Sequence, residues 1–104
     1  MKKAIAVDFD GCLCKDKYPG IGKANVSVIR SLIKYRKAGA KVILWTCRDG
    51  DLLARAVAWC ARNGLHFDAV NDNLPERVAK YGSNSRKVSA DEYWDDKAKR
   101  VKCT

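Results

Sequence analysis

Two short apolar segments constrain the fold of this chain more than any other feature of its sequence. Residues 4–7 read Ala-Ile-Ala-Val, and residues 41–46 read Lys-Val-Ile-Leu-Trp-Thr. Apolar runs of this length, without alternating polar residues, are typical of strands buried on both faces of a sheet. Such strands need a layer of helices on each side, so the rest of the sequence has to supply those helices.

The rest of the chain alternates between helical and extended patterns. Asn25, and Asp49 or Asp51, stand where helix caps are expected, each followed by apolar residues at helical spacing. The order strand, helix, strand, helix, strand, helix, strand predicts an α/β fold. We expect a three-layer α/β/α Rossmann-like domain with a mainly parallel sheet. We expect residues 1–104 to form a single domain. The other expected elements are strands at 67–70 and within 88–94 and a short helix at 74–81.

The charge of the chain favours an anionic partner. The 104 residues include 21 Lys and Arg against 12 Asp and Glu, which gives a net charge of +9. This excess suits a nucleic acid, a phosphorylated molecule or an acidic surface, and it leaves the oligomeric state open. No apolar run has the length of a membrane span, and the N-terminal apolar run is broken by Asp8 before it reaches the length of a secretory signal. We therefore expect a cytoplasmic protein without membrane association. Five cysteines without a CxxC pair favour reduced thiols.

Carboxylates collect where the predicted strands end. Asp8 and Asp10 follow the first strand, and Asp95 and Asp96 follow the fourth. In sheets of this kind the ligand crevice lies outside the carboxyl ends of the strands, so these carboxylates are expected to meet there. Their mutual repulsion requires a compensating cation or proton. Oxygen ligands without histidine favour a hard cation, and above all Mg²⁺.

Three further residues could bring phosphate-binding groups to the same crevice. Thr46 and Arg48 follow the second strand, and Lys87 precedes the fourth. Taken alone, Thr46 would be an ordinary strand residue, Arg48 a surface arginine and Lys87 a solvated lysine. In the same way, a single Asp after a strand is usually a helix cap or a turn former. Taken together, they suit the binding of a phosphate beside the carboxylates.

Four segments of the chain follow one another in a fixed order: Val7-Asp8-Phe9-Asp10-Gly11, Leu44-Trp45-Thr46, Lys87 and Tyr93-Trp94-Asp95-Asp96. This ordered set resembles the four motifs of phosphatases of the haloacid dehalogenase-like (HAD) superfamily, over about residues 4 to 97. The stretches 43–48 and 89–96 are similar to a group of small hydrolase-like proteins of that superfamily. The resemblance implies a HAD-like hydrolase core that cleaves phosphomonoesters with Mg²⁺ as cofactor.

The resemblance also implies the catalytic and metal-binding roles. Asp8 is expected to be the nucleophile, which splits hydrolysis into two easier steps through an aspartyl-phosphate. Asp10 is expected to act as the general acid for the leaving group and then as the base for the attacking water. The expected metal ligands are Asp8, the backbone carbonyl of Asp10, Asp95 and Asp96.

Phosphate binding is expected to fall to residues of the middle motifs. By the resemblance, Thr46 would hydrogen-bond the phosphoryl group and Lys87 would neutralise its charge, with Arg48 as a further contact. Lys87 lies closer to Asp95 in sequence than in many relatives, so Lys80 is the alternative for its role. Cys12 stands where a Thr or Val is commoner in the first motif.

Many members of this superfamily carry a cap domain over the site, and this chain has little room for one. Only residues 12–24 are available after the first motif, enough for a small flap hairpin, and the predicted elements use the span between Thr46 and Lys87. We therefore expect a capless member with an open site. Such a site admits phosphorylated small molecules and also macromolecular ends, although the sequence contains no nucleic-acid recognition motif.

Two other functions stay open at this point. The chain could be a binding or regulatory protein, possibly for nucleic acid, that keeps the fold with weak or no catalysis. It could also be a phospho-receiver domain, which uses Asp, Mg²⁺, Thr and Lys on a parallel sheet with the acceptor after the third strand. Here that strand ends near Val70-Asn71-Asp72, and the Asp-x-Asp pair on the first strand favours the hydrolase.

Overall fold

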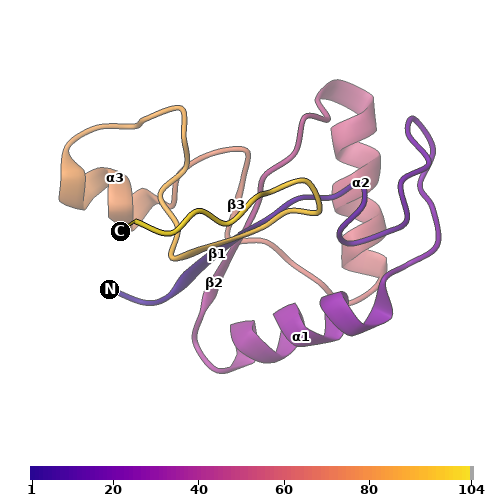
Figure 1. Cartoon of the computed structure of the whole chain (residues 1–104), viewed down its shortest axis with the longest axis horizontal. Coiled ribbons are helices and arrows are strands. Elements are labelled where there is room, and N and C mark those ends of the chain that lie inside the picture. The colour runs from indigo at the N-terminus through magenta and orange to yellow at the C-terminus, as the bar shows by residue number, and fades with distance from the viewer. Residues whose placement is uncertain (104) are drawn as a thin grey trace.

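A computed structural model describes residues 1–103 of the chain. It is an α/β domain in which a parallel sheet is covered by helices on both faces, so the expected three-layer architecture is confirmed (Figure 1). Strands and helices alternate along the chain as predicted. They are β1 (Ala4–Val7), α1 (Val26–Lys37), β2 (Lys41–Leu44), α2 (Gly50–Arg62), β3 (Ala69–Val70), α3 (Pro75–Tyr81) and β4 (Glu92–Trp94).

The four strands are arranged in the order β3-β2-β1-β4, and every neighbouring pair is parallel. The two apolar segments that dominate the sequence form the centre of the sheet, where Val7 lies opposite Leu44. On the other side of β1, Val7 lies opposite Trp94 of β4. All strands therefore finish at one edge of the sheet, which we call the carboxyl edge, and begin at the opposite one, the amino edge.

Each face of the sheet packs against its own helices. Ile5, Val7 and Val42 point toward Ile29 and Leu32 of α1 and toward α2, in the larger of two buried clusters. The opposite face carries Ala4, Ala6 and Ile43, which pack against Leu74 at the start of α3 and against Val88. This alternation explains why the sequence shows continuous apolar runs instead of a two-residue period.

The elements differ from the predicted ones mainly at their ends. β2 stops at Leu44 and β3 has only two residues, although the backbone N–H of Trp45 still donates to Val7 at 2.9 Å. Asn25 and Asp49 are the N-cap residues of α1 and α2 as expected, but neither side chain makes a capping hydrogen bond. Instead, the amide of Asn25 donates to the carbonyl of Cys12 and ties the helix to the segment before it.

The segment between β1 and α1 folds back on itself as a small flap. Its two arms run antiparallel, with the N–H of Lys15 donating to the carbonyl of Lys23 at 2.8 Å. The arms are packed so closely that a Cβ on Gly22 would lie 2.1 Å from the carbonyl oxygen of Lys15. The described residues form no helix long and apolar enough to cross a membrane.

Candidate functional site

Three of the four predicted carboxylates meet at the carboxyl edge. Asp8 directly follows β1, and Asp95 and Asp96 directly follow the neighbouring strand β4. The N–H of Asp8 donates to the carbonyl of Trp94 at 2.9 Å, so the two strands leave the sheet side by side. Each of the three side chains offers one oxygen, and these oxygens lie within 4.8 Å of one another.

The electrostatics of this cluster are those of gathered negative charge. The pKa of Asp8 is raised from 3.8 to about 6, first because the side chain is partly buried and then because Asp95, Asp96 and Asp10 repel its charge. The backbone N–H of Phe9, which donates to the Asp8 carboxylate at 2.8 Å, lowers this pKa in part. The neighbouring thiol of Cys12 has its pKa raised to about 11 by burial and by Asp8, so it stays protonated and unreactive near neutral pH.

The donor set fits a hard divalent cation. It consists of carboxylate oxygens that converge in a partly exposed position, which is the ligand type that Mg²⁺ prefers. A cation there would relieve the repulsion that raises the pKa of Asp8. The expected fourth ligand, the backbone carbonyl of Asp10, remains a prediction.

Gly11 lies beside this cluster. It was part of the first sequence motif, but no role was predicted for it. Its φ of +84° is one that glycine adopts readily, and a Cβ on it would lie 2.3 Å from a carboxylate oxygen of Asp96. The Asp96 side chain therefore rests against the bare Cα of Gly11. This contact positions Asp96 beside Asp8 and requires glycine at residue 11.

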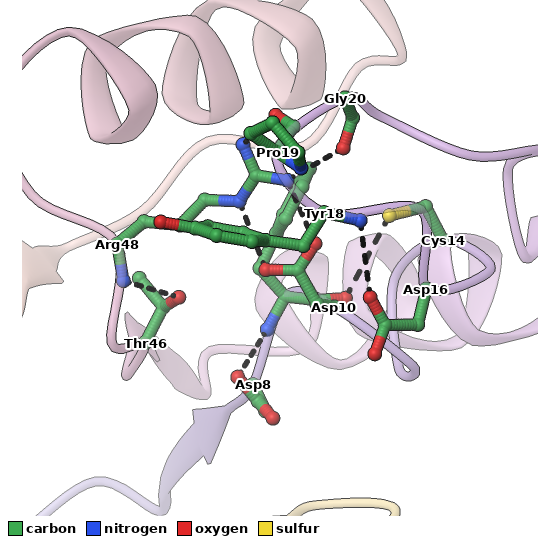
Figure 2. Close-up of polar contacts among 10 residues, drawn as sticks. Asp8, Asp10, Cys14, Asp16, Tyr18, Pro19, Gly20, Thr46 and Arg48 are labelled. Carbon is green, nitrogen blue, oxygen red and sulfur yellow. Dashed lines mark hydrogen bonds and ion pairs between the residues drawn. The ribbon is translucent and has the colours of Figure 1, made fainter.

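Asp10 points away from the other carboxylates. Both of its oxygens accept hydrogen bonds from Arg48, at 2.9 Å from Nε and 2.7 Å from one terminal nitrogen. Figure 2 shows the Asp10 carboxylate turned toward the guanidinium, while the Asp8 carboxylate points in the opposite direction. In this conformation Asp10 is part of an ion pair and is not directed at a substrate beside Asp8.

Arg48 does not lie where a phosphate contact was expected. It is only 2% exposed, and its guanidinium donates to the carbonyls of Pro19 and Gly20 in the flap as well as to Asp10 (Figure 2). The rings of Phe9 and Tyr18 lie 4.9 and 5.1 Å from its central carbon. Arg48 therefore joins the flap to β1 and occupies its donors internally. An arginine with this many internal partners cannot be told from a surface arginine by sequence alone.

Thr46 lies at the carboxyl edge, held by a residue that sequence reasoning did not select. Asn71 follows β3 with a positive φ of 51°. Its side-chain oxygen accepts from the N–H of Thr46 at 2.8 Å, and its amide donates to the carbonyl of Arg48. The Thr46 hydroxyl accepts from the N–H of Arg48 at 3.1 Å. Asn71 is thus a positioning residue for the loop after β2. The only sequence signal for it is an asparagine placed directly after a strand.

Neither candidate lysine contacts Asp8 in this conformation. The ammonium of Lys87 lies 5.3 Å from the centre of the Tyr93 ring, and that of Lys80 lies 5.7 Å from the Tyr81 ring on α3. Within residues 1–103, no ion pair joins either lysine to a carboxylate of the cluster. Lys87 is exposed and lies in a bend of the loop before β4.

Open hollows lie beside the carboxyl edge. Residues 1–103 form no separate domain that covers it. One hollow of about 330 Å³ lies beside Gly11 and is lined by Lys15 and Lys23 of the flap. Another, of about 360 Å³, is lined by Trp45, Asn71 and Arg86. The flap over residues 12–24 has the small size that was expected, and the open site remains a prediction.

Comparison with known proteins gives one informative match. No protein-family model matches the chain, and no curated protein matches it. Among solved structures, a conserved protein from Bacteroides thetaiotaomicron is 37% identical and superposes with a TM-score of 0.83, over 94% of this chain and 78% of that one. At this identity and coverage, the chain belongs to the same family as the conserved Bacteroides thetaiotaomicron protein.

Proposed function

We propose that the chain is a Mg²⁺-dependent phosphomonoester hydrolase, a small capless member of the HAD superfamily. The observation that supports this function most is the meeting of Asp8, Asp95 and Asp96 at the carboxyl edge, with their oxygens within 4.8 Å. The strands that carry these residues are adjacent and parallel, in agreement with the motif order of the superfamily. Asp72, the acceptor of the receiver alternative, follows the edge strand β3 and instead accepts hydrogen bonds from Asn73 and Asn84.

In the proposed reaction the carboxylate of Asp8 attacks the phosphorus atom of the substrate. The bond between phosphorus and the ester oxygen breaks, and the leaving alcohol takes up a proton. Water then attacks the aspartyl-phosphate, which releases inorganic phosphate and restores Asp8. Mg²⁺ bound by Asp8, Asp95 and Asp96 would supply the charge neutralisation that a phosphoryl transition state needs.

Asp10 is proposed to transfer the protons in both steps. Its carboxylate is bound to Arg48 in the described conformation, so proton transfer requires it to leave the guanidinium and turn toward the substrate. Because the same guanidinium holds the carbonyls of Pro19 and Gly20, this turn is coupled to the flap. The flap would therefore rearrange when substrate binds.

Phosphate binding is proposed for the Thr46 hydroxyl and for Lys87, with Lys80 as the alternative. The loop after β2 that carries Thr46 is already ordered by Asn71. Lys87 would have to swing from the Tyr93 ring toward Asp8. The open carboxyl edge suits small phosphate esters and also the phosphorylated ends of larger molecules.

The direct test is hydrolysis of an aryl phosphate with and without Mg²⁺ by the wild type and by Asp8→Asn. Loss of the nucleophile should lower kcat by at least about 10³-fold, because the covalent route is then closed. Asp51→Asn is a matched control, since Asp51 is an exposed carboxylate in the first turn of α2, and it should keep full activity. Equal activity of Asp8→Asn and the wild type would refute the mechanism.

The competing reading is a binding protein that keeps the fold without catalysis. It would be supported if the wild type with Mg²⁺ hydrolysed no member of a panel of sugar phosphates, nucleotides, aryl phosphates and 5′- or 3′-phosphorylated oligonucleotides. Lys87→Ala and Lys80→Ala, measured on any substrate that is cleaved, decide which lysine assists. The assisting lysine should show the larger fall in kcat/KM.

A further inference from the structure

A second feature of the molecule lies at the amino edge, at the opposite end of the strands from the carboxylates. Three hollows adjoin one another there. One of about 450 Å³ lies between the starts of β1 and β2 and the segment after α2. It shares Lys2, Gly39 and Ala40 with a hollow of about 330 Å³, which in turn shares Tyr35 and Ala38 with one of about 420 Å³ along α1. We call these three hollows the amino-edge groove.

The amino-edge groove is strongly basic. Its lining residues include a single carboxylate, Asp68. That carboxylate is already paired with Arg36 and lies 3.9 Å from the ammonium of Lys41, so it holds these two cations in place without cancelling the rest. The cations that line the groove are Lys2, Lys3, Lys34, Arg36, Lys37 and Lys41.

Lys3 is paired with Glu92 of β4, so three of these cations have no acidic partner. Lys2, Lys34 and Lys37 take part in no ion pair within the described part of the chain, and all three are exposed. Like charges gathered around a groove raise the local potential and attract anions. Nothing in the proposed hydrolase uses these residues, since the carboxylates lie at the other end of the sheet.

An aromatic ring lies where two of the hollows meet. Tyr35 is 39% exposed and lines both the hollow that contains Lys3 and the hollow that contains Lys34. Its ring contacts Trp94 edge to face, at 5.9 Å between centroids, and the ammonium of Lys3 lies 5.0 Å from its centre. A ring fixed in this way offers a stacking surface between cations.

We propose that the amino-edge groove binds single-stranded nucleic acid, with phosphates on Lys2, Lys34 and Lys37 and a base near Tyr35. Open hollows in a row suit an extended polyanion better than a compact one, because successive phosphates can each meet a cation. Basic tracks interrupted by aromatic rings are the usual arrangement for single strands. After β4 the chain runs back toward the side of the molecule on which it begins (Figure 1).

The test is fluorescence anisotropy with labelled oligothymidine and oligouridine about 20 nucleotides long, at several salt concentrations. The groove variant is Lys2→Glu/Lys37→Glu. Its matched control is Lys17→Glu/Arg55→Glu, which makes the same change in net charge at exposed positions on the flap and on α2. The groove variant should bind about 30-fold more weakly, and its salt slope should fall by about 1.4, as expected for two lost single-strand phosphate contacts. The control should stay within about threefold of the wild type, because it touches no phosphate.

Tyr35→Leu tests the stacking contribution, because leucine can keep an apolar contact with Trp94 but offers no ring. It should weaken binding about tenfold, within the range for one stacked base. Equal losses in the groove variant and its control would show that net charge alone attracts the strand, and would overturn the assignment to this groove. Absence of binding by the wild type, or equal affinity for duplex DNA, would overturn it as well. Asp8→Asn should bind like the wild type, so failure of the proposed hydrolase and failure of this groove are distinguishable.

Discussion

The two edges of one sheet handle charge in opposite ways. At the carboxyl edge, three carboxylates converge and the pKa of Asp8 rises to about 6 because burial and its neighbours oppose ionisation. At the amino edge, Asp68 is also partly buried, which alone would raise its pKa. There the hydrogen bonds from Arg36 and from the N–H of Val42 outweigh burial, and the pKa of Asp68 is lowered. Asp68 is thus compensated by the cation of Arg36, whereas Asp8 lies among other carboxylates.

This difference separates a candidate functional site from a structural contact. The ion pair between Arg36 and Asp68 connects α1 to the segment before β3, and the arginine already compensates the charge of the carboxylate. A cluster of carboxylates such as Asp8, Asp95 and Asp96 needs a cation or a proton to compensate its negative charge. Carboxylates with perturbed pKa values are common at functional sites. The Arg48–Asp10 pair belongs to the first type, although it stands next to the second.

The largest expected effect comes from breaking the buried pair at the carboxyl edge. Arg48→Met should lower the free energy of unfolding by about 3–5 kcal/mol, because it leaves Asp10 without its partner and frees the flap carbonyls. Arg36→Met, at the amino edge, removes a pair whose arginine side chain is 38% exposed, and should cost no more than about 1 kcal/mol. Urea unfolding monitored by circular dichroism measures both. Equal losses would mean that the two pairs contribute alike and that the flap is not held by Arg48.

A smaller effect is expected from the pH dependence of stability in the presence of EDTA. Asp8 has a higher pKa in the folded protein than its ordinary value of 3.8, so the folded state keeps its proton longer as the pH rises. Ionisation of Asp8 therefore removes stability as the pH rises from about 4 to 6, and Asp8→Asn should be more stable than the wild type at about pH 7.5. The gain should largely disappear near pH 4, where the Asp8 side chain of the folded wild type is protonated and neutral.

Asp68→Asn is the matched change at the amino edge and has the opposite sign. The pKa of Asp68 is lowered by folding, so its ionised form stabilises the folded state, and this contribution is lost only as the pH falls below the ordinary value of 3.8. The variant should therefore melt at a lower temperature than the wild type at about pH 7.5. Melting temperatures of the three proteins between about pH 4 and 8 provide the comparison. A destabilised Asp8→Asn at neutral pH would contradict the repulsion assigned to the cluster.

Much of the fold was predictable because it depends on local patterns. The apolar runs at 4–7 and 41–46 are typical of strands covered on both faces, and the parallel pairing of β1 with β4 brings Asp8 to the same edge as Asp95 and Asp96. The convergence of Asp8 with Asp95 and Asp96 was therefore expected from strand ends alone. The metal that this convergence suits remains a prediction.

The contacts that sequence reasoning missed join residues far apart in the chain. Arg48 was expected to contact the phosphate, because nothing in the sequence around it reveals that Asp10 and the flap carbonyls would surround its guanidinium. The roles of Asn71 and Gly11 were missed for the same reason. Asn71 acts through its hydrogen bond with Thr46, and Gly11 through its close contact with Asp96. Periodicity reports which face of an element is buried, and it carries no information about such pairs.

We propose that the carboxyl edge holds a divalent cation and that the amino edge does not. Mn²⁺ takes the same oxygen ligands as Mg²⁺ and broadens the NMR signals of nearby nuclei. Added in small amounts to isotope-labelled protein, it should broaden the amide signals of Phe9, Gly11 and Asp96, leave those of Lys3 and Lys41 sharp, and be displaced by excess Mg²⁺. Broadening that is absent, or that is centred away from Asp8, Asp95 and Asp96, would contradict the account.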